Sequence, residues 1–203
     1  SSFENTGLDE WDFAIVDSPG SFVDTESVLV HHGQFAGRSI TGSGTNRSSV
    51  FKHLDTGYTT LALRMDIMVV SGQLPEYGHR DFAQFYQGTT WKSTVKFGVK
   101  RFKDNLLHVA VWDNGPYSGS NYLGDVWEPG RWYTVEIMAT QHGDGTGTLE
   151  FWIDGVKKYS RTDANVGNIP WAKLQVGNYS GETGAIDLVL DNVILDDQFI
   201  PFN

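Results

Sequence analysis

The sequence contains no cysteine among its 203 residues. This absence excludes a disulfide-stabilised scaffold, a thiol nucleophile and a cysteine-ligated zinc site. It leaves the cellular compartment open. The first residues, SSFENTG, also lack the basic and apolar regions of a signal peptide, so secretion has to be argued from the fold.

Positive charge is scarce as well. Lysine and arginine number 15 against 25 for aspartate and glutamate, which gives a formal net charge of −10. An acidic surface repels phosphate backbones and anionic lipids, so nucleic acid is not an expected partner. No apolar run is long enough to span a bilayer, so membrane insertion is not expected. A neutral ligand is compatible with this charge, and carboxylates can hold calcium.

What the chain does have is a period-two alternation of apolar and polar residues, which is the pattern of half-buried strands. Alternating segments occupy residues 61–69, 96–100, 108–112, 133–138, 149–154 and 186–195. Turn pairs such as Asn-Gly at 114–115 and Asp-Gly at 154–155 lie between them. Short alternating strands with glycine-rich turns predict an antiparallel sandwich or barrel. The length favours a single domain over residues 1–203.

The segment HGDGTG, residues 142–147, admits three interpretations. A phosphate-binding loop ends in Gly-Lys-Ser/Thr before a helix, whereas the next lysine here is Lys157 and a strand pattern follows. An EF-hand loop needs oxygen ligands at alternate positions, and Asp144 is the only early carboxylate. Glycines that accept positive φ, flanked by two alternating segments, favour a hairpin turn, and this is our prediction.

Three segments together resemble a known family. They are GQFAGRSITGSG (33–44), PGRWYTVEIMATQHGDGTGTLEFWIDGVKKY (129–159) and LQVGNYSGETGAIDLVLDNVILDD (174–197). Their order is similar to that of the concanavalin A-like, laminin-G-like jelly-roll family, which includes carbohydrate-binding modules and related polysaccharide lyases. The resemblance implies an all-β fold, an antiparallel two-sheet jelly-roll sandwich.

Several catalytic signatures are missing from the sequence. No strand carries the paired glutamates with which retaining glycosidases on such sandwiches act, and no G-x-S-x-G elbow is present. His31 and His32 are the only close histidine pair. Adjacent strand residues point to opposite faces, so a zinc site is not expected there.

A polysaccharide lyase is the enzymatic alternative. It needs a base such as histidine or tyrosine, and arginine, glutamine or asparagine to neutralise a uronate carboxylate. Arg64, Gln84, Tyr86 and His108 each fall on an expected strand and could line one concave face. The lyase motifs R-[ST]-E and Q-[IV]-H do not occur, and the net charge opposes an anionic substrate.

A sugar-binding module needs less chemistry, because pyranose rings stack on flat aromatic side chains. Aromatic residues gather in 75–91 and 111–127, among glycine and polar residues that seldom form a core. Trp127 and Trp132 are expected to be structural. The predicted ligand platform comprises Tyr86, Trp91, Trp112, Tyr117 and Tyr122.

The resemblance also implies a structural calcium ion where the first and last strands meet. Glu4 and Asp191 match the positions that such families use as ligands, and carboxylates suit a hard cation. The alternative is that Glu4 is solvated and Asp191 caps a turn.

These observations predict a secreted, non-catalytic carbohydrate-binding or adhesion domain of a larger extracellular protein, with a polysaccharide or glycan as its partner and Ca²⁺ as a structural ion. The first alternative is a lyase that acts on a uronate-containing polysaccharide. The second is a structural domain of a surface assembly that packs against neighbouring domains.

Overall fold

The computed structural model describes residues 3, 8–17, 20–42, 47–114, 121–179 and 184–202, and only the backbone of 121–123. Within them, every named element is a strand. Sheet A contains, in spatial order, β1 (Phe13–Val16), β4 (Ser48–Tyr58), β13 (Trp171–Tyr179), β6 (His79–Gln87), β7 (Ser93–Arg101), β8 (Leu107–Asp113) and β9 (Asn121–Val126). Sheet B contains β12 (Val156–Ala164), β11 (Gly147–Ile153), β10 (Trp132–Gln141), β5 (Thr60–Gln73), β14 (Ala185–Asp196), β3 (Ala36–Thr41) and β2 (Phe22–Glu26). A search of this part of the chain finds no helix fit to cross a membrane.

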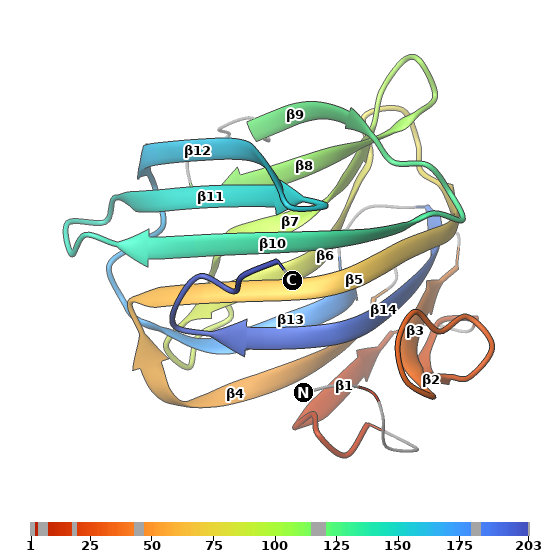
Figure 1. Ribbon diagram of the computed structural model, residues 1–203, viewed down its shortest axis with the longest axis horizontal. Helices are drawn as coiled ribbons and strands as arrows, with labels where there is room; N and C mark the ends of the chain where they lie inside the picture. The colour runs from red at the N-terminus through yellow and green to blue at the C-terminus, as the bar shows by residue number, and fades with distance from the viewer. Residues whose placement is uncertain are drawn as a thin grey trace.

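The two sheets lie face to face as a jelly-roll sandwich (Figure 1). Strands that are distant in the sequence become neighbours, because β13 lies between β4 and β6, and β14 lies between β5 and β3. The paired strands are antiparallel, for example β13 with β6 and β14 with β5. The predicted fold, an all-β antiparallel two-sheet jelly roll, is confirmed.

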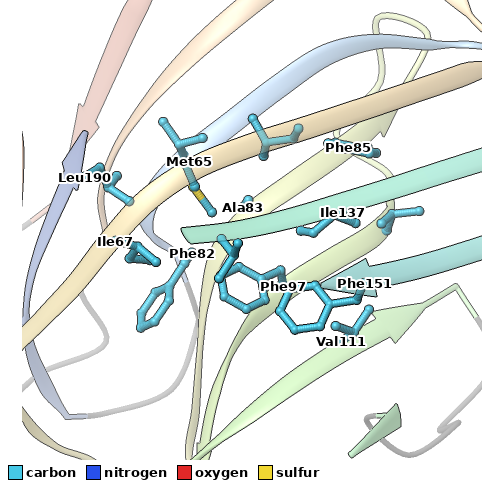
Figure 2. Packing of buried hydrophobic residues seen from close by; sticks show 14 of the residues in the cluster. Met65, Ile67, Phe82, Ala83, Phe85, Phe97, Val111, Ile137, Phe151 and Leu190 are labelled. Atoms are coloured by element: carbon cyan, nitrogen blue, oxygen red, sulfur yellow. The ribbon is translucent and has the colours of Figure 1, made fainter. Parts of the chain in front are cut away.

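Alternating side chains from both sheets fill the space between them (Figure 2). Met65 and Ile67 of β5 face Phe82 of β6 and Phe97 of β7, and all four are buried. Burying one such side chain stabilises the fold by about 1.5–3 kcal/mol. Because this burial specifies which residues point inward, it also determines which residues stand on the outer face of each sheet.

The segment HGDGTG is the turn of the β10–β11 hairpin, as predicted. Gly143 and Gly145 have φ of 91° and 93°, a region that glycine adopts without steric cost. Asp144 accepts a hydrogen bond from the N–H of Thr146 at 2.9 Å. The carboxylate therefore stabilises the turn locally.

The segment after β14 packs on the outer face of sheet B (Figure 1). Ile200 donates its N–H to Glu136 of β10 at 3.0 Å, and Arg64 of β5 donates to the carbonyl of Pro201. Phe199 lies 5.2 Å from the ring of Trp152. These contacts cover the middle of the outer face of sheet B.

Candidate functional site

A row of side chains crosses the outer face of sheet A. The strand register places Phe51, Gln175, Gln84, Lys96 and Trp112 directly opposite one another on β4, β13, β6, β7 and β8, and we call these five residues the transverse row. Directly opposed residues point to the same face of a sheet. At one strand spacing each, the row covers about 19 Å, which an extended polymer can follow.

Lys173 is a buried lysine beside this row. It lies opposite Tyr86 on one neighbouring strand and opposite His53 on the other. Its exposed fraction is 2%, and its Nζ lies 3.5 Å from the ring centroid of Trp91 and 4.8 Å from that of Tyr86. Burial lowers the pKa of Lys173, and no carboxylate of the described residues forms an ion pair with it. An anionic group brought to this amine would compensate its burial.

Two tyrosines lie together at the same end of the face. Arg47 donates from Nη1 to the hydroxyl of Tyr179 at 3.1 Å, and its guanidinium lies 5.2 Å from the centre of that ring. Arg47 also forms an ion pair with Asp17. Burial, together with the adjacent Tyr179, raises the pKa of Tyr86, so Tyr86 keeps its proton. Tyr179 is partly exposed, and its hydroxyl oxygen lies beside the Arg47 guanidinium.

Asp81 organises the polar groups at the centre of the face. It is buried and accepts a hydrogen bond from Nε2 of Gln84 at 2.9 Å. The amine of Lys96 lies 3.8 Å from its carboxylate and the ring of His79 lies 3.9 Å away. Gly98 of β7 is paired with Asp81 and has no side chain, so this position of β7 does not cover the Asp81 carboxylate. The arrangement holds the Gln84 amide in one orientation.

Gln175 contributes an unsatisfied acceptor to the row. Its Nε2 donates to the carbonyl of Gly177 at 3.1 Å, whereas its Oε1 is buried and has no hydrogen-bond partner among the described residues. Buried acceptors are nearly always paired in folded proteins. A donor such as a water molecule or a sugar hydroxyl would complete this group.

The four residues predicted for a lyase do not all lie on the same sheet face. Gln84, Tyr86 and His108 lie in sheet A, and the register places all three on its outer face. The prediction is wrong for Arg64, which lies on β5 in sheet B and donates to Pro201. Alternation shows that a residue points outward but not from which sheet, so the sequence pattern could not separate Arg64 from the others. His108 is engaged with Asp104, at 2.8 Å, away from the transverse row.

The predicted aromatic platform is present in part. Trp91, 57% exposed, and Trp112, partly buried, both lie on the outer face of sheet A. Tyr86 is 1% exposed beneath Lys173 and cannot serve as a stacking surface, which corrects that prediction. Tyr117 lies outside the described residues, and so does the side chain of Tyr122, whose backbone belongs to β9. Trp127 is a core residue, as expected.

The calcium prediction stays a prediction. Glu4 lies outside the described residues. Asp191 is buried, and its carboxylate accepts hydrogen bonds from the N–H groups of His31, His32 and Asn192. A carboxylate has about four acceptor positions, and N–H donors occupy three of those on Asp191. Asp191 therefore has one position left for a cation, whereas Ca²⁺ requires six to eight oxygen ligands.

The expectation that His31 and His32 point apart is wrong. Both residues lie in a bend between β2 and β3 rather than in a strand. Their ring nitrogens approach one oxygen of Asp66, at 3.2 and 3.4 Å. Residue pairs in a bend need not alternate across a sheet, and this is why the strand argument failed.

Sequence reasoning missed the residues of β13. Lys173, Gln175 and Tyr179 lie on the strand AKLQVGNY, whose LQVG was interpreted only as a fold motif. The i, i+2 spacing of Lys173 and Gln175 places both on one face and was an available signal. Tyr179 keeps this spacing, but a register shift between Val176 and Tyr179 changes its partner on β6, and alternation does not predict that partner.

A cavity also lies away from the transverse row. It has a volume of about 380 Å³ and opens at the edge of the sandwich near β9 and β12, between residues such as Val109 and Val156. Its charged groups pair with one another, since Lys158 binds Asp125 at 3.0 Å and Arg131 binds Asp154 at 3.1 Å. Because of these ion pairs, the charged groups of this cavity are less available to a ligand than those of the transverse row.

No family model and no curated protein matches this sequence. Solved structures do match the fold. The endo-β-1,4-glucuronan lyase from the fungus Trichoderma reesei aligns over 95% of this chain and 93% of its own, with a TM-score of 0.70 and 17% identity. The cellulose induced protein Cip1 aligns over 94% of both chains, with a TM-score of 0.62 and 15% identity. The alginate lyase A1-II', of polysaccharide lyase family 7, aligns over 88% of this chain and 84% of its own, with a TM-score of 0.59 and 18% identity.

These similarities show that the chain has the concanavalin A-like jelly-roll fold. They also overturn the prediction of a non-catalytic binding module. The structures that match most of the chain include a glucuronan lyase and alginate lyases, so the comparison favours the enzymatic alternative. The error arose because aromatic side chains on a sheet face serve stacking in binding modules and in enzymes alike.

Proposed function

We propose that this protein is a polysaccharide lyase that acts on a uronate-containing polysaccharide at the outer face of sheet A. The observation that carries the proposal is the buried Lys173, which lacks a carboxylate partner in the described residues and lies beside Gln84, Gln175 and two tyrosines. A uronate carboxylate supplies the missing negative charge. The lyase structures of the same fold support this assignment.

The reaction is a β-elimination across C5 and C4 of a uronate unit. A base removes the C5 proton, the C5–H electrons form the C4–C5 double bond, and the C4–O bond to the neighbouring sugar breaks. The leaving oxygen then takes a proton. The C5 proton is weakly acidic because a carboxylate stands next to it, so neutralising that carboxylate lowers the barrier most.

Cationic and polar side chains on the outer face of sheet A supply this neutralisation. The ammonium of Lys173 lies beneath Trp91, and Lys96 stands between Gln84 and Trp112 in the transverse row. Asp81 fixes the Gln84 amide through Nε2, so a second N–H of this amide is available to a carboxylate oxygen. Such preorganised donors stabilise the dianionic intermediate formed when C5 loses its proton.

Tyr179 is the residue that we assign to proton transfer. As a phenolate, held by the hydrogen bond from Arg47, Tyr179 accepts the C5 proton and becomes a phenol. Tyr86, with its raised pKa, remains a phenol and acts as the neighbouring hydrogen-bond donor. Trp112 and Trp91 flank these groups and hold adjoining sugars by stacking.

The cationic side chains at this site are opposite in sign to the net charge of the chain. The chain has a formal net charge of −10, which disfavours an acidic polymer. The face itself carries Arg47, Lys96 and Lys173, and the histidines His53 and His79. At contact distance these nearby cations outweigh remote carboxylates, since solvent ions screen the latter. A polymeric substrate too large to enter a cell further implies that the enzyme acts outside it.

The test is incubation with glucuronan, alginate and polygalacturonate, with cellulose as a neutral control, while ultraviolet absorbance of the unsaturated product is recorded. We expect absorbance to rise with at least one acidic polymer. Tyr179→Phe should lower kcat by about 10²–10⁴-fold, the usual contribution of a general acid or base. Tyr77→Phe, at an exposed tyrosine remote from the row, is the matched control. Absence of product from every acidic polymer, or full activity of Tyr179→Phe, contradicts the proposal.

A further inference from the structure

Two buried carboxylates face each other on the outer side of sheet B. Asp66 of β5 and Asp191 of β14 are opposite residues in the strand pairing and are 2% and 1% exposed. Neither forms an ion pair with a lysine or arginine of the described residues. Two adjacent buried negative charges are costly unless a cation balances them.

Two imidazoles stand over this carboxylate pair. His31 Nδ1 lies 3.2 Å from Asp66 Oδ2, and His32 Nε2 lies 3.4 Å from the same oxygen. One possible ligand atom from each of the three residues lies within 4.8 Å of those from the other two. Ligand atoms about 2.0–2.1 Å from a tetrahedral zinc ion are about 3.3 Å apart, so the two nitrogen–oxygen distances match the edges of such a site. Imidazoles that bind a metal ion through these nitrogens contribute ligands, and the ion supplies the compensating charge.

The surrounding contacts hold these ligands in place. His31 stacks on Trp132 with ring centroids 4.9 Å apart. The backbone N–H groups of His31 and His32 both donate to Asp191, which fixes the bend from which the rings project. Thr134 donates its hydroxyl to the other oxygen of Asp66 at 2.6 Å. Partners that orient ligands in this way are typical of built metal sites.

We propose that His31, His32 and Asp66 bind a zinc ion. Two imidazole nitrogens and one carboxylate oxygen suit a borderline transition metal, whereas Ca²⁺ prefers six to eight oxygens. The ligand atoms differ from those of the calcium prediction at Glu4 and Asp191. The fourth position is open to water, because the side chain of His32 is 61% exposed.

The position of the site indicates a structural role. Asp66 stands on the outer face of sheet B, so the core separates the site from the transverse row. A bound ion would join the segment between β2 and β3 to β5. Zinc should therefore raise the melting temperature, since a ligand that binds only the folded state stabilises it by mass action.

The test uses chelator-treated full-length protein titrated with zinc chloride in a calorimeter. We expect one zinc per chain and a higher Tm. His32→Ala and Asp66→Asn should each weaken zinc affinity at least ~10-fold, and Thr134→Val should weaken it by about 10-fold through the orientation of Asp66. His32 is exposed, so His32→Ala tests the site even if Asp66→Asn fails to fold. His142→Ala, at an exposed histidine of the β10–β11 hairpin, is the matched control.

Calcium and magnesium chlorides are titrated in parallel. Zinc binding that survives excess magnesium and is lost in His32→Ala supports the proposal. No zinc binding, equal affinity in His32→Ala and the parent, or calcium binding in the absence of zinc binding overturns it. The heat of binding and the Tm are independent of lyase activity, so failure of this site and failure of the proposed function are distinguishable.

Discussion

At the scale of single residues, Lys173 has the clearest consequence. Its buried amine has a lowered pKa, so the folded protein binds fewer protons than the unfolded chain between that pKa and the ordinary value of 10.5. Stability should therefore rise with pH across this interval. Lys173→Met, which keeps the length and removes the charge, should abolish this rise and be at least as stable as the parent at pH 7, while kcat/KM falls at least ~10-fold.

Urea unfolding at a series of pH values measures the stability, and the ultraviolet assay measures the activity. Lys96→Met is the control, because Lys96 is partly exposed and its amine lies within 3.8 Å of Asp81. A variant of Lys173 that loses stability at pH 7 and keeps full activity would show that the amine serves packing alone.

The limits of sequence reasoning are clearest for these same residues. Gln84 and Tyr86 were found because a polar or aromatic residue on an alternating strand points to a definite face. Lys173 was missed because its function depends on Trp91 and Tyr86, which are brought to it by pairing between β13 and β6. Arg64 was misplaced for the same physical reason, since strand pairing is a long-range property that local alternation does not encode.

At the scale of elements, the β6–β7 pair depends on a glycine. A Cβ at Gly98 would collide with the backbone carbonyl of Arg80, where the register shifts between Asp81 and Ala83. Gly98→Ala should destabilise the fold by about 1–3 kcal/mol, because backbone cannot move aside as a flexible side chain can. It should also lower activity, since the carboxylate of Asp81 lies opposite.

Urea unfolding and the ultraviolet assay are again the measurements. Gly143→Ala in the β10–β11 turn is the control, because its Cβ meets open space but its φ of 91° is left-handed. That variant should lose about 1–2 kcal/mol and keep its activity. Equal stability of Gly98→Ala and the parent would contradict the proposed close approach.

The segment after β14 makes a second element-scale prediction, through Glu136. Desolvation raises the pKa of this buried carboxyl, so the folded protein holds more protons than the unfolded chain between the ordinary 4.5 and the raised value. Stability should therefore fall as pH rises through this interval. Glu136→Gln keeps an acceptor for the N–H of Ile200, and should remove this fall and raise Tm at pH 7 by a few degrees, roughly 2–4 °C per kcal/mol.

Thermal unfolding between pH 4 and 8 checks this expectation. Glu150→Gln on the adjacent strand is the control, because Glu150 is paired with Lys157 and partly exposed. A parent and a Glu136→Gln variant with the same pH profile would show that the carboxyl is adequately solvated. Strands and turns of this kind were predictable from alternation and glycine, whereas the docking of a terminal segment on sheet B was not, because it requires the completed sheet.

At the scale of the whole molecule, the net charge of −10 and the cationic face make a prediction about salt. At about 10 mM salt the Debye length is roughly 30 Å, so the acidic surface repels a polyuronate before it arrives. At about 150 mM the length is roughly 8 Å, which screens remote carboxylates but not contacts with Lys96 and Lys173.

We expect kcat/KM to rise several-fold between these conditions with kcat unchanged, and to fall again near 1 M, where the length is about 3 Å. Initial rates in sodium chloride measure this, and Asp163→Asn, at a remote exposed carboxylate, should raise kcat/KM slightly at low salt only. A decline that begins at 10 mM would instead mean that the cationic face governs the approach of substrate from a distance.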